Sequence, residues 1–449
     1  MPQQQKQNSD SSNELIAWFR KATPYINAHR GKTFVISLSG DAIADDHIHN
    51  LIHDIVLLNS LGIKLVIVHG IRKQLDELLA TQNQSSQFVQ GLRVTDQKTL
   101  DASIQASSLL RSRLESKLSM GLPNSPMHGA KVKVASANVV TAKPAGVIDG
   151  VDLEHTGFVR KIDQQAIHNL LEMGNVVLLS PIGHSPSGQA FNISYQNLAA
   201  EIAIATQANK LITFVADDGM RNREQEFVHE LTPEQAHSWL KEHQDSDQRD
   251  NELSLCVKAC VAAVESQVER AHLMSFKQDG ALLQELFSVD GSGTLIQKKD
   301  FELLRTANES DIPAIIDIIR PLEQQGVLVK RERDLLEKEI SYFSVIEREE
   351  LIIAVAALYP SEDGKSAEIA CITTHRDYRG SNRGATLLNH LEEKANILGV
   401  ELIFVLTTQT THWFIEQGFS EASISQLPDE KKNLYNHQRN SKILIKHLR

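Results

Sequence analysis

Residues 368–384, EIACITTHRDYRGSNRG, indicate the fold of the last third of this chain. The first seven of these residues predict a strand, and residues 385–391, ATLLNHL, have the apolar spacing of a helix. The polar turn between them contains small residues. Such a turn presents backbone N–H groups and the positive end of a helix dipole to an anion, so we predict a phosphate-binding turn. Glycine and serine also begin helices for capping reasons alone, and that alternative stays open.

The flanking segments extend this pattern. Residues 301–307, FELLRTA, predict a strand, and Asp311 follows as the cap of a helix. Residues 402–406, LIFVL, predict a buried strand, and residues 413–419, WFIEQGF, predict a short helix that ends at a glycine. With these neighbours, the segment from about residue 300 to the end resembles a GCN5-related N-acetyltransferase domain, a mixed α/β fold that binds acetyl-CoA.

That resemblance implies that the turn binds the pyrophosphate of acetyl-CoA. The expected coenzyme-binding residues of the turn are Arg379, Gly380, Ser381, Asn382, Arg383 and Gly384. Asn382 stands where the family motif has a glycine. Asparagine adopts left-handed backbone conformations more readily than other side chains, so we expect the turn to form.

Length and composition exclude several classes of protein. A chain of 449 residues is long enough for about two or three domains. No apolar run approaches the roughly 20 residues that cross a bilayer, and residues 1–7 lack the apolar core of a secretion signal. Three cysteines are too few for a disulfide framework. We therefore expect a cytoplasmic protein with no membrane partner, and the net charge of −11 argues against a nucleic-acid partner.

Cys256 and Cys260 are one helical turn apart. This spacing is compatible with a shared metal ion, but no His or Cys pair lies near them in the sequence, so a packed helix face explains them better. We expect no metal.

The larger front part of the chain alternates apolar strand runs with helical patterns. Strands are predicted at residues 33–38, 64–68 and 175–179, and helices at residues 47–60 and 99–118. This order predicts a mainly parallel sheet between layers of helices. The front part is similar to the amino acid kinase family, and within it to acetylglutamate kinases, at residues 34–40, 66–70, 192–203 and 211–220.

The chain is thus expected to be an α/β protein with two domains. Residues 1–12 are polar and predicted to be disordered, residues 13–297 are expected to form the kinase-like three-layer sandwich, and residues 298–449 the acetyltransferase domain.

The kinase-like domain lacks groups that phosphoryl transfer requires. An active kinase of this family needs a lysine on its first strand to neutralise charge on the phosphoryl group, and glycines where the backbone approaches phosphates. Ser37 stands at the lysine position, Ser39 at the next glycine position, and the glycine run after His69 reads GIR. We predict that this domain does not phosphorylate a substrate.

A regulatory role is implied by a second part of the resemblance. His272, Glu285, Gly291 and Gly293 match the segment with which arginine-sensitive acetylglutamate kinases bind their feedback inhibitor. A carboxylate can accept hydrogen bonds from a guanidinium or an α-ammonium group, and a glycine-rich turn leaves room for a ligand. A strand-joining turn with a surface glutamate is the alternative.

Residues 13–28 predict a helix with Leu15, Trp18, Phe19 and Ala22 on one stripe. In the arginine-sensitive kinases such a helix links dimers into hexameric rings, so the resemblance implies a homo-oligomer and specifically a hexamer. The alternative is that the stripe packs on its own domain.

The fusion of the two domains resembles the arrangement of the bacterial N-acetylglutamate synthases. This implies transfer of acetyl from acetyl-CoA to the α-amino group of L-glutamate, the first step of arginine biosynthesis, with inhibition by L-arginine. Three alternatives stay open: an enzyme that also has kinase activity, an arginine sensor without catalysis, and acetylation of another amine such as a protein lysine.

The reaction itself requires particular groups. The α-ammonium of glutamate must lose a proton before its nitrogen attacks the thioester, and Glu368 is the candidate base, directly or through water. Its alternative role is that of an exposed strand residue. By the family resemblance, Cys371 and Ile372 lie on a bulged strand whose backbone N–H groups polarise the acetyl carbonyl.

The departing thiolate needs a proton or a strong hydrogen bond. Many relatives use a tyrosine, but that position is Phe414 here. By the resemblance we assign this role to Thr407, with Thr408 and Tyr435 as alternatives.

Two carboxylates on the substrate call for basic residues outside the coenzyme turn. We assign Arg331 and Arg439 to them, because a guanidinium donates two parallel hydrogen bonds, and Ser441 as a further donor. Solvated surface charges are the alternative for both arginines.

Overall fold

The computed structural model describes residues 16, 18–20, 22–121, 125–243, 252–288, 291–298, 302–348, 351–379, 382–434 and 441–448. Internal contacts divide the chain into two compact units, Met1–Lys299 and Asp300–Arg449. The predicted tail at residues 1–12 lies outside the described residues. Within the described part, no helix combines the length and the apolar character needed to cross a membrane.

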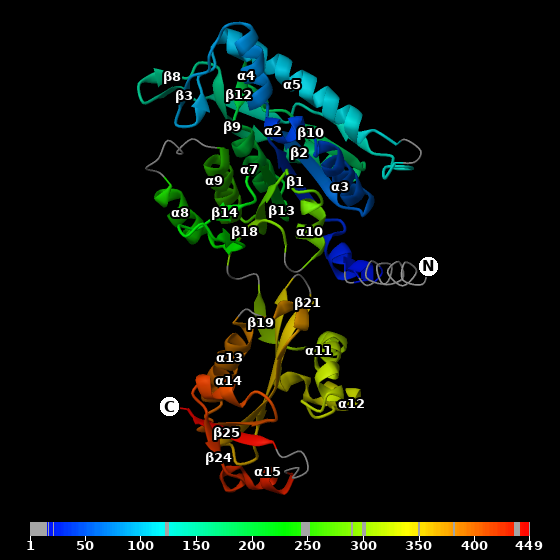
Figure 1. Ribbon diagram of the computed structural model, residues 1–449, viewed down its shortest axis with the longest axis vertical. Helices are drawn as coiled ribbons and strands as arrows, with labels where there is room; N and C mark the ends of the chain where they lie inside the picture. The colour runs from blue at the N-terminus through cyan, green and yellow to red at the C-terminus, as the bar shows by residue number, and fades with distance from the viewer. Residues whose placement is uncertain are drawn as a thin grey trace, which may run out of the picture. The chain divides into compact units, whose positions relative to one another are not determined.

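The first unit is built on an eight-stranded sheet (Figure 1). In order across the sheet its strands are β16 (Glu230–Leu231), β18 (Thr294–Gln297), β17 (Arg270–Ser275), β13 (Lys210–Val215), β1 (Thr33–Leu38), β2 (Lys64–His69), β10 (Asn175–Leu179) and β5 (Lys133–Ala135). Every neighbouring pair is parallel except β17 with β18. The central strands are buried on both faces, which explains their continuous apolar sequences.

Helices cover both faces of this sheet. Because successive side chains of a strand point to opposite faces, Val35 joins one core and its neighbours Phe34 and Ile36 join the other. The Val35 core includes residues of α6 (Gln164–Glu172), α7 (Tyr195–Ala205), α8 (Pro233–Glu242) and α9 (Glu252–Glu265). The Phe34 core includes residues of α2 (Gly40–Ala44), α3 (Ile48–Ser60), α4 (Arg72–Thr81), α5 (Gln97–Leu118) and α10 (Ala281–Phe287). The predicted three-layer sandwich with a mainly parallel sheet is confirmed.

Shorter strands complete the first unit. Four of them, β6 (Val140–Pro144), β9 (Thr156–Ile162), β11 (Ile182–His184) and β12 (Ala190–Ile193), form a small closed barrel. Three two-stranded pairs are β3 (Phe88–Val89) with β4 (Leu92–Arg93), β7 (Val147–Ile148) with β8 (Val151–Asp152), and β14 (Met220–Arg221) with β15 (Phe227–Val228). Cys256 and Cys260 are fully buried on α9, so the predicted packed helix face is confirmed.

The N-terminal helix of the first unit presents two aromatic side chains to solvent. Residues 22–29 are helical, and Ala22 is buried against the Phe34 core. Trp18 and Phe19 are 45% and 62% exposed, so these two residues of the predicted stripe are largely open to solvent, and Leu15 lies outside the described residues. At the other end of the helix, the Nε2 atom of His29 lies 3.0 Å from the carbonyl oxygen of Leu286 on α10. The helix is therefore fixed to α10 and exposes its Trp18 end.

The second unit contains a seven-stranded sheet. In order its strands are β19 (Leu303–Thr306), β20 (Phe343–Arg348), β21 (Leu351–Pro360), β22 (Ser366–Thr374), β23 (Leu402–Thr407), β25 (Lys442–His447) and β24 (Ser420–Ala422). Only β22 and β23 are parallel neighbours. A parallel pair needs a long crossover connection, and α13 (Arg383–Ile397) lies in that connection.

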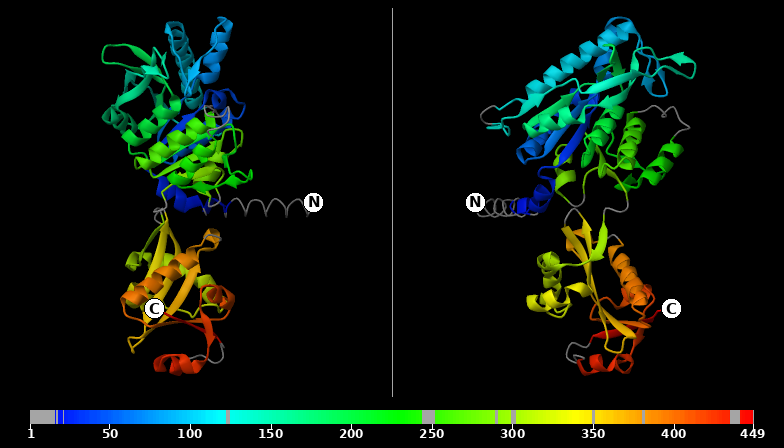
Figure 2. Two further views of the ribbon diagram at one scale, coloured as in Figure 1. Left: turned by 90° about the vertical axis from the view of Figure 1, so that its left-hand side faces the viewer. Right: turned by 180° about the vertical axis from the view of Figure 1, so that it is seen from behind.

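Two helices pack on opposite faces of this sheet, as the right-hand view in Figure 2 shows. One core contains Leu387, Leu388 and Leu391 of α13, and the other contains Ile315 and Ile319 of α11 (Ile312–Gln324). The remaining helical elements are η2 (Glu309–Asp311), α12 (Arg333–Glu339), η3 (Ile340–Tyr342), η4 (Arg376–Tyr378), α14 (Thr411–Glu416), η5 (Ile424–Gln426) and α15 (Asp429–Leu434). The predicted mixed α/β fold of this part is confirmed.

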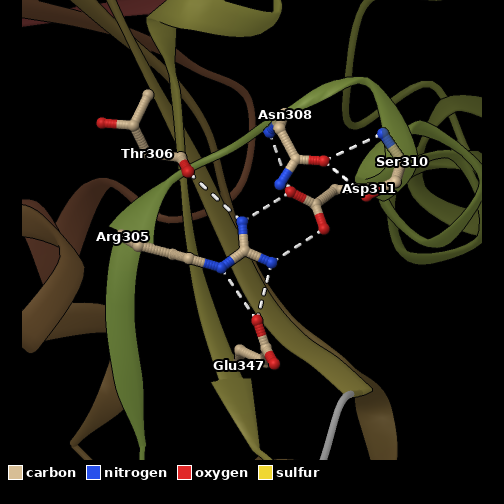
Figure 3. Close-up of polar contacts among 6 residues, drawn as sticks. All are labelled: Arg305, Thr306, Asn308, Ser310, Asp311 and Glu347. Atoms are coloured by element: carbon tan, nitrogen blue, oxygen red, sulfur yellow. Dashed lines mark hydrogen bonds and ion pairs between the residues drawn. The ribbon is translucent and has the colours of Figure 1, made fainter.

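A network of hydrogen bonds around Arg305 fixes the first strand of the second unit to the start of α11 (Figure 3). The Arg305 guanidinium donates to both carboxylate oxygens of Asp311, at 2.7 and 2.9 Å, and to Glu347 at 2.8 Å. Asp311 also accepts from the backbone N–H of Asn308. The hydrogen bonds from Arg305 outweigh the effect of burial and lower the pKa of Asp311.

We expect Asp311→Asn to lower the stability of the second unit by about 1–3 kcal/mol, because the charge-assisted hydrogen bonds between Arg305 and the buried Asp311 carboxylate are lost. A carboxyl group with a lowered pKa stabilises the fold above its unfolded-state pKa and ceases to do so as the pH falls through its folded pKa. The difference between variant and wild type should therefore be constant from pH 5 to 8 and should shrink below about pH 4. Thermal unfolding across this range measures it. Asp317→Asn is the control, since Asp317 is exposed and lies 3.9 Å from Arg320; a similar loss in both variants would contradict the role of the network.

Candidate active site

Strands β22 and β23 separate within the sheet of the second unit. They pair only where Ser366–Glu368 runs beside Leu402–Phe404. Beyond this point β22 continues to Thr374 and β23 to Thr407 without pairing to each other. Backbone groups on the two facing edges are then available to an extended ligand that lies between the strands. Glu368 is the last residue of β22 that pairs with β23, so it lies at the start of this opening.

A β-bulge lies in the part of β22 that no longer pairs with β23. Val355 pairs with Thr373 and Ala357 with Ala370, so Cys371 and Ile372 together oppose a single residue of β21. Cys371 has a left-handed backbone, with φ of 57°. A bulge interrupts the ladder and redirects N–H groups. The bulge expected at these two residues is confirmed, and their contact with an acetyl group stays a prediction.

The Cys371 thiol is not available as a nucleophile at neutral pH. Burial, reinforced by the negative charge of Glu368 and opposed by Arg331, raises the pKa of Cys371 to about 11. The thiol is therefore protonated, in agreement with direct acetyl transfer without a cysteine intermediate.

Glu368 has a lysine as its direct partner. Its carboxylate lies 2.5 Å from the Nζ atom of Lys431 on α15, and the two side chains are 15% and 28% exposed. Glu368 is therefore not an exposed strand residue. It is a half-buried carboxylate whose present partner is an ammonium group.

Arg331 approaches the same region from the loop before α12. Its guanidinium lies 5.9 Å from the ring centroid of Tyr359, and Tyr359 is paired with Glu368 across the β21–β22 ladder. Burial opposes the charge of Arg331, but Cys371, Tyr359 and Glu368 raise its pKa, so the guanidinium stays charged. The structure thus brings Arg331 and Glu368, which are distant in sequence, to one site.

Three residues that the sequence did not single out, Tyr359, Glu339 and Glu323, support this site. The Tyr359 hydroxyl donates to Glu339 at 2.9 Å, and burial raises the pKa of Tyr359. The Oε1 atom of Glu323 accepts from the backbone N–H of Arg331 at 2.9 Å. These contacts position the Tyr359 ring and the Arg331 loop. Tyr359 could have been found only from the register of β21 against β22, which places it opposite Glu368.

The candidate proton donor lies at the far end of β23. Thr407 is buried, and its hydroxyl accepts from the backbone N–H groups of Gln409 and Thr410 and lies 2.8 Å from the Thr410 hydroxyl. Thr407 pairs with Lys442, so the adjacent Ser441 is at the same end of the opening. Thr408 is exposed. Tyr435 and Arg439 lie outside the described residues.

The coenzyme turn leads into α13, whose N-terminal N–H groups suit an anion. Asn382 is the N-cap residue with φ of −67°, so the explanation that asparagine replaces a left-handed glycine is wrong: ordinary backbone is sufficient there. Gly384 packs closely on Trp413: a Cβ atom at this position would lie 3.3 Å from the ring, a tight contact. Arg379 is exposed, and Gly380 and Ser381 lie outside the described residues.

The side chain of Arg383 is engaged within the domain. Its Nε donates to both oxygens of Glu302 at 3.0 Å, its Nη2 to Glu302 at 2.6 Å, and its Nη1 to the carbonyl of Tyr378 at 2.8 Å. The guanidinium therefore fixes the end of the turn to the chain before β19. Its backbone N–H, in the first turn of α13, is the part of Arg383 that suits coenzyme binding.

The residues of the predicted arginine site come together in the first unit. Glu285 lies 2.6 Å from Nδ1 of His272, and its other oxygen accepts from the N–H groups of Ser292 and Gly293 at 2.6 and 3.0 Å. Burial acts in the opposite direction, but His272 and these N–H groups lower the pKa of Glu285 to about 2. Burial lowers the pKa of His272 despite its acidic partner. The alternative of a surface glutamate in a simple turn is therefore wrong, because the Glu285 side chain is only 5% exposed.

The residues that stand at the positions of the missing kinase groups have other roles in the structure. Ser37 is fully buried on β1, and the Ser39 hydroxyl caps α2 by accepting from the N–H of Ala42. The Tyr195 ring covers Gly70, since a Cβ atom at Gly70 would lie 2.8 Å from it. The backbone that would approach a phosphate in an active kinase is therefore covered by an aromatic ring.

Comparisons with known proteins agree with this two-domain arrangement. Residues 32–275 match the model of the amino acid kinase family, and residues 312–419 match that of the acetyltransferase (GNAT) family. The chain is 46% identical over 433 residues to an amino-acid acetyltransferase of Pseudomonas syringae pv. syringae, covering 96% of this chain and 99% of the relative.

Two solved structures of N-acetylglutamate synthase from Neisseria gonorrhoeae are also similar, each with 37% sequence identity. The complex with coenzyme A and L-arginine covers 96% of this chain and 99% of that chain, with a TM-score of 0.86. The complex with coenzyme A and N-acetyl-glutamate covers 97% of this chain and 99% of that chain, with a TM-score of 0.62. Because identity at this level extends over almost the whole length of these proteins, the chain belongs to the amino-acid acetyltransferase family.

Proposed function

We propose that this protein is an N-acetylglutamate synthase, which transfers acetyl from acetyl-CoA to the α-amino group of L-glutamate in the first step of arginine biosynthesis. The observation that carries the proposal is the position of Glu368, a half-buried carboxylate at the point where β22 and β23 part, with Arg331 on the same face. The opening offers backbone edges to the donor, Glu368 offers a base to an ammonium group, and Arg331 offers a cation to a carboxylate. The role of acetyl-CoA as donor supports a cytoplasmic location.

In the proposed mechanism each residue has one task. Glu368 takes the proton of the α-ammonium group, directly or through water, and the neutral amine attacks the thioester carbonyl. Backbone N–H groups at the Cys371–Ile372 bulge stabilise the charge that develops on the carbonyl oxygen. The Thr407 hydroxyl passes a proton to the departing thiolate and regains one, directly or through water, from the nitrogen, which loses its second proton as the amide forms. Two N–H groups donate to the Thr407 oxygen, so its own proton is directed away from them, toward Thr410 or a ligand.

We place arginine inhibition at the cluster of His272, Glu285, Gly291 and Gly293. A Cβ atom at Gly291 would lie 2.7 Å from Glu285, so the turn closes tightly around the carboxylate. Neutral His272 that donates from Nδ1 leaves Nε2 as a buried acceptor with no hydrogen-bond partner among the described residues. This acceptor and the Glu285 carboxylate support recognition of a guanidinium group.

A homo-oligomer, specifically a hexamer, is part of the proposal. It is supported by the exposed Trp18 and Phe19 on the N-terminal helix, since large apolar side chains gathered on one exposed segment mark interaction surfaces. Light scattering of the purified chain measures the mass of the particle and tests this part.

The proposed reaction is tested with the purified chain, acetyl-CoA, L-glutamate and a thiol reagent that detects free CoA, with mass spectrometry of the product. Glutamate-dependent release of CoA together with N-acetylglutamate is expected, and it should fall when L-arginine is added. Adding ATP and N-acetylglutamate should give no phosphorylated product, because the kinase positions are Ser37 and Ser39. Absence of CoA release from folded protein would refute the proposal.

Arg331→Met is expected to raise the glutamate KM by about 10–100-fold, because a charge-assisted hydrogen bond to a carboxylate is lost. The acetyl-CoA KM should change little, since the residue lies on the acceptor side. Steady-state kinetics with each substrate varied in turn measures both constants. Arg333→Met is the matched control: Arg333 is an exposed arginine nearby that pairs with Glu337 on its own helix. An equal rise in both KM values would exclude Arg331 from acceptor binding.

A further inference from the structure

The contact between Glu368 and Lys431 joins two segments that are 63 residues apart in the sequence. Lys431 lies on the short helix α15, and its Nζ atom is 2.5 Å from the carboxylate that the proposed mechanism uses as the base. Exposed ion pairs contribute little to stability, so a lysine on the surface would need no functional explanation. This pair is half-buried and includes the reacting carboxylate, which makes its chemistry relevant to the acceptor.

The charges around Glu368 are complementary to those of an acidic amino acid. Among the residues that the structure describes, two cations, Arg331 and Lys431, accompany one carboxylate, Glu368. Glutamate carries two carboxylates and one ammonium group. The other acidic residues nearby are already engaged, Glu339 with the Tyr359 hydroxyl and Glu323 with the backbone N–H of Arg331. The pair Glu368 and Lys431 matches the ammonium and one carboxylate of the substrate.

We propose that Lys431 binds the α-carboxylate of the acceptor amino acid, and that the substrate enters by exchanging partners with the Glu368–Lys431 ion pair. The α-ammonium and the α-carboxylate are attached to the same carbon atom. When the α-ammonium reaches Glu368, the carboxylate beside it therefore lies next to Lys431. Glu368 exchanges Lys431 for the α-ammonium group, and Lys431 exchanges Glu368 for the α-carboxylate. Neither Glu368 nor Lys431 is therefore left unpaired at the half-buried site. Arg331 then binds the side-chain carboxylate of the substrate.

This assignment explains selection for a free amino acid. A protein lysine offers an ammonium group without a carboxylate on the same carbon, so it would leave Lys431 without its new partner. A buried charge that loses its partner is costly, and such a substrate is disfavoured. The assignment rests on the proposed acetylation of glutamate, and it identifies the residue that binds the α-carboxylate.

The test compares ligands that lack one charged group each. Lys431→Met should raise the glutamate KM by about 10–100-fold, through the loss of one charge-assisted hydrogen bond. As competitive inhibitors against glutamate, glutarate has both carboxylates without the ammonium group, and 4-aminobutyrate has the ammonium group without the α-carboxylate. The Ki of glutarate should rise like the glutamate KM, whereas the Ki of 4-aminobutyrate should change less than about threefold. Lys431→Arg should recover part of the loss.

Lys432→Met is the matched control, because Lys432 is the next residue on α15 and pairs with Asp429 within its own helix at 2.8 Å. It should leave all these constants unchanged. An unchanged glutamate KM in Lys431→Met, an unchanged Ki of glutarate, or an equal loss for 4-aminobutyrate would each overturn the assignment. If wild-type protein shows no glutamate-dependent release of CoA, the proposed function fails instead. Unaltered thermal unfolding of Lys431→Met separates a binding effect from a loss of fold.

Discussion

Glu368→Gln is expected to lower kcat for acetyl transfer to glutamate by about 10²–10⁴-fold, the range of a lost general base. A glutamine side chain has the same shape and can still accept a hydrogen bond from Lys431, but it cannot take a proton from an ammonium group. In the proposed mechanism the donor lies along the separated strands, so the acetyl-CoA KM should change little. The pH profile should also change: the variant depends on hydroxide or buffer to deprotonate the amine, so its rate should continue to rise with pH where that of the wild type becomes level.

Glu401→Gln is the matched control for this prediction. Glu401 is an exposed carboxylate just before β23, paired with Lys365 at 3.7 Å. It should leave kcat and the pH profile unchanged. A Glu368→Gln variant that unfolds like the wild type and retains kcat within tenfold would show that the base lies elsewhere. A loss confined to the glutamate KM would assign Glu368 to binding alone.

Much of the fold could be predicted because it rests on local patterns. Strands β1 and β10 were predicted with their observed limits, since strands buried on both faces appear as unbroken apolar runs. The helix that follows the coenzyme turn was predicted from its apolar spacing, and the structure extends it to Arg383–Ile397. Two-residue strands such as β3 were not predicted, because so short a segment has no periodicity of its own.

The site could be predicted only in part, because its partners are distant in the sequence. Glu368 was identified since it precedes a recognisable turn, and Arg331 since an acidic substrate needs a cation. Lys431 gives no local signal, because its contact with Glu368 depends on where α15 packs. Arg383 was assigned to the coenzyme from its place in the motif, whereas its side chain is bound by Glu302, 81 residues before it.

The first unit keeps a kinase-like sheet but fills its reactive positions with groups that serve packing. Ser37 is buried without a hydrogen-bond partner among the described residues, and Tyr195 covers Gly70. Such changes leave the fold intact, since the sheet is held by its apolar faces. The cluster around Glu285 lies elsewhere in this unit, on α10 and the turn before β18, so it can bind a ligand without the kinase chemistry.

Glu285→Gln is expected to raise the arginine concentration for half-inhibition by about 100-fold or more, because hydrogen bonds between a carboxylate and a cation contribute about 1.5–3 kcal/mol each. The rate without arginine should stay within about twofold, since the residue is not part of the acetyltransferase domain. Inhibition curves of the acetyl-transfer rate measure both quantities. Glu269→Gln is the matched control, as Glu269 is exposed just before β17 and accepts a hydrogen bond from Asn209. Equal inhibition of Glu285→Gln and wild type would remove this cluster from arginine binding.

A second variant separates the charge of Glu285 from the shape of its turn. At Gly293 a Cβ atom would lie 2.3 Å from the carbonyl oxygen of Leu273, so Gly293→Ala must displace the turn while the carboxylate remains. Because the pKa of Glu285 is about 2, the carboxylate stays charged at any assay pH above about 4, and a pH-dependent loss of inhibition there would have another cause.

The neighbouring Leu286 accepts a hydrogen bond from the N-terminal helix through His29. A ligand that moves α10 therefore acts directly on the helix that exposes Trp18, and loss of inhibition in Gly293→Ala is expected to accompany loss of any arginine-dependent change in particle mass.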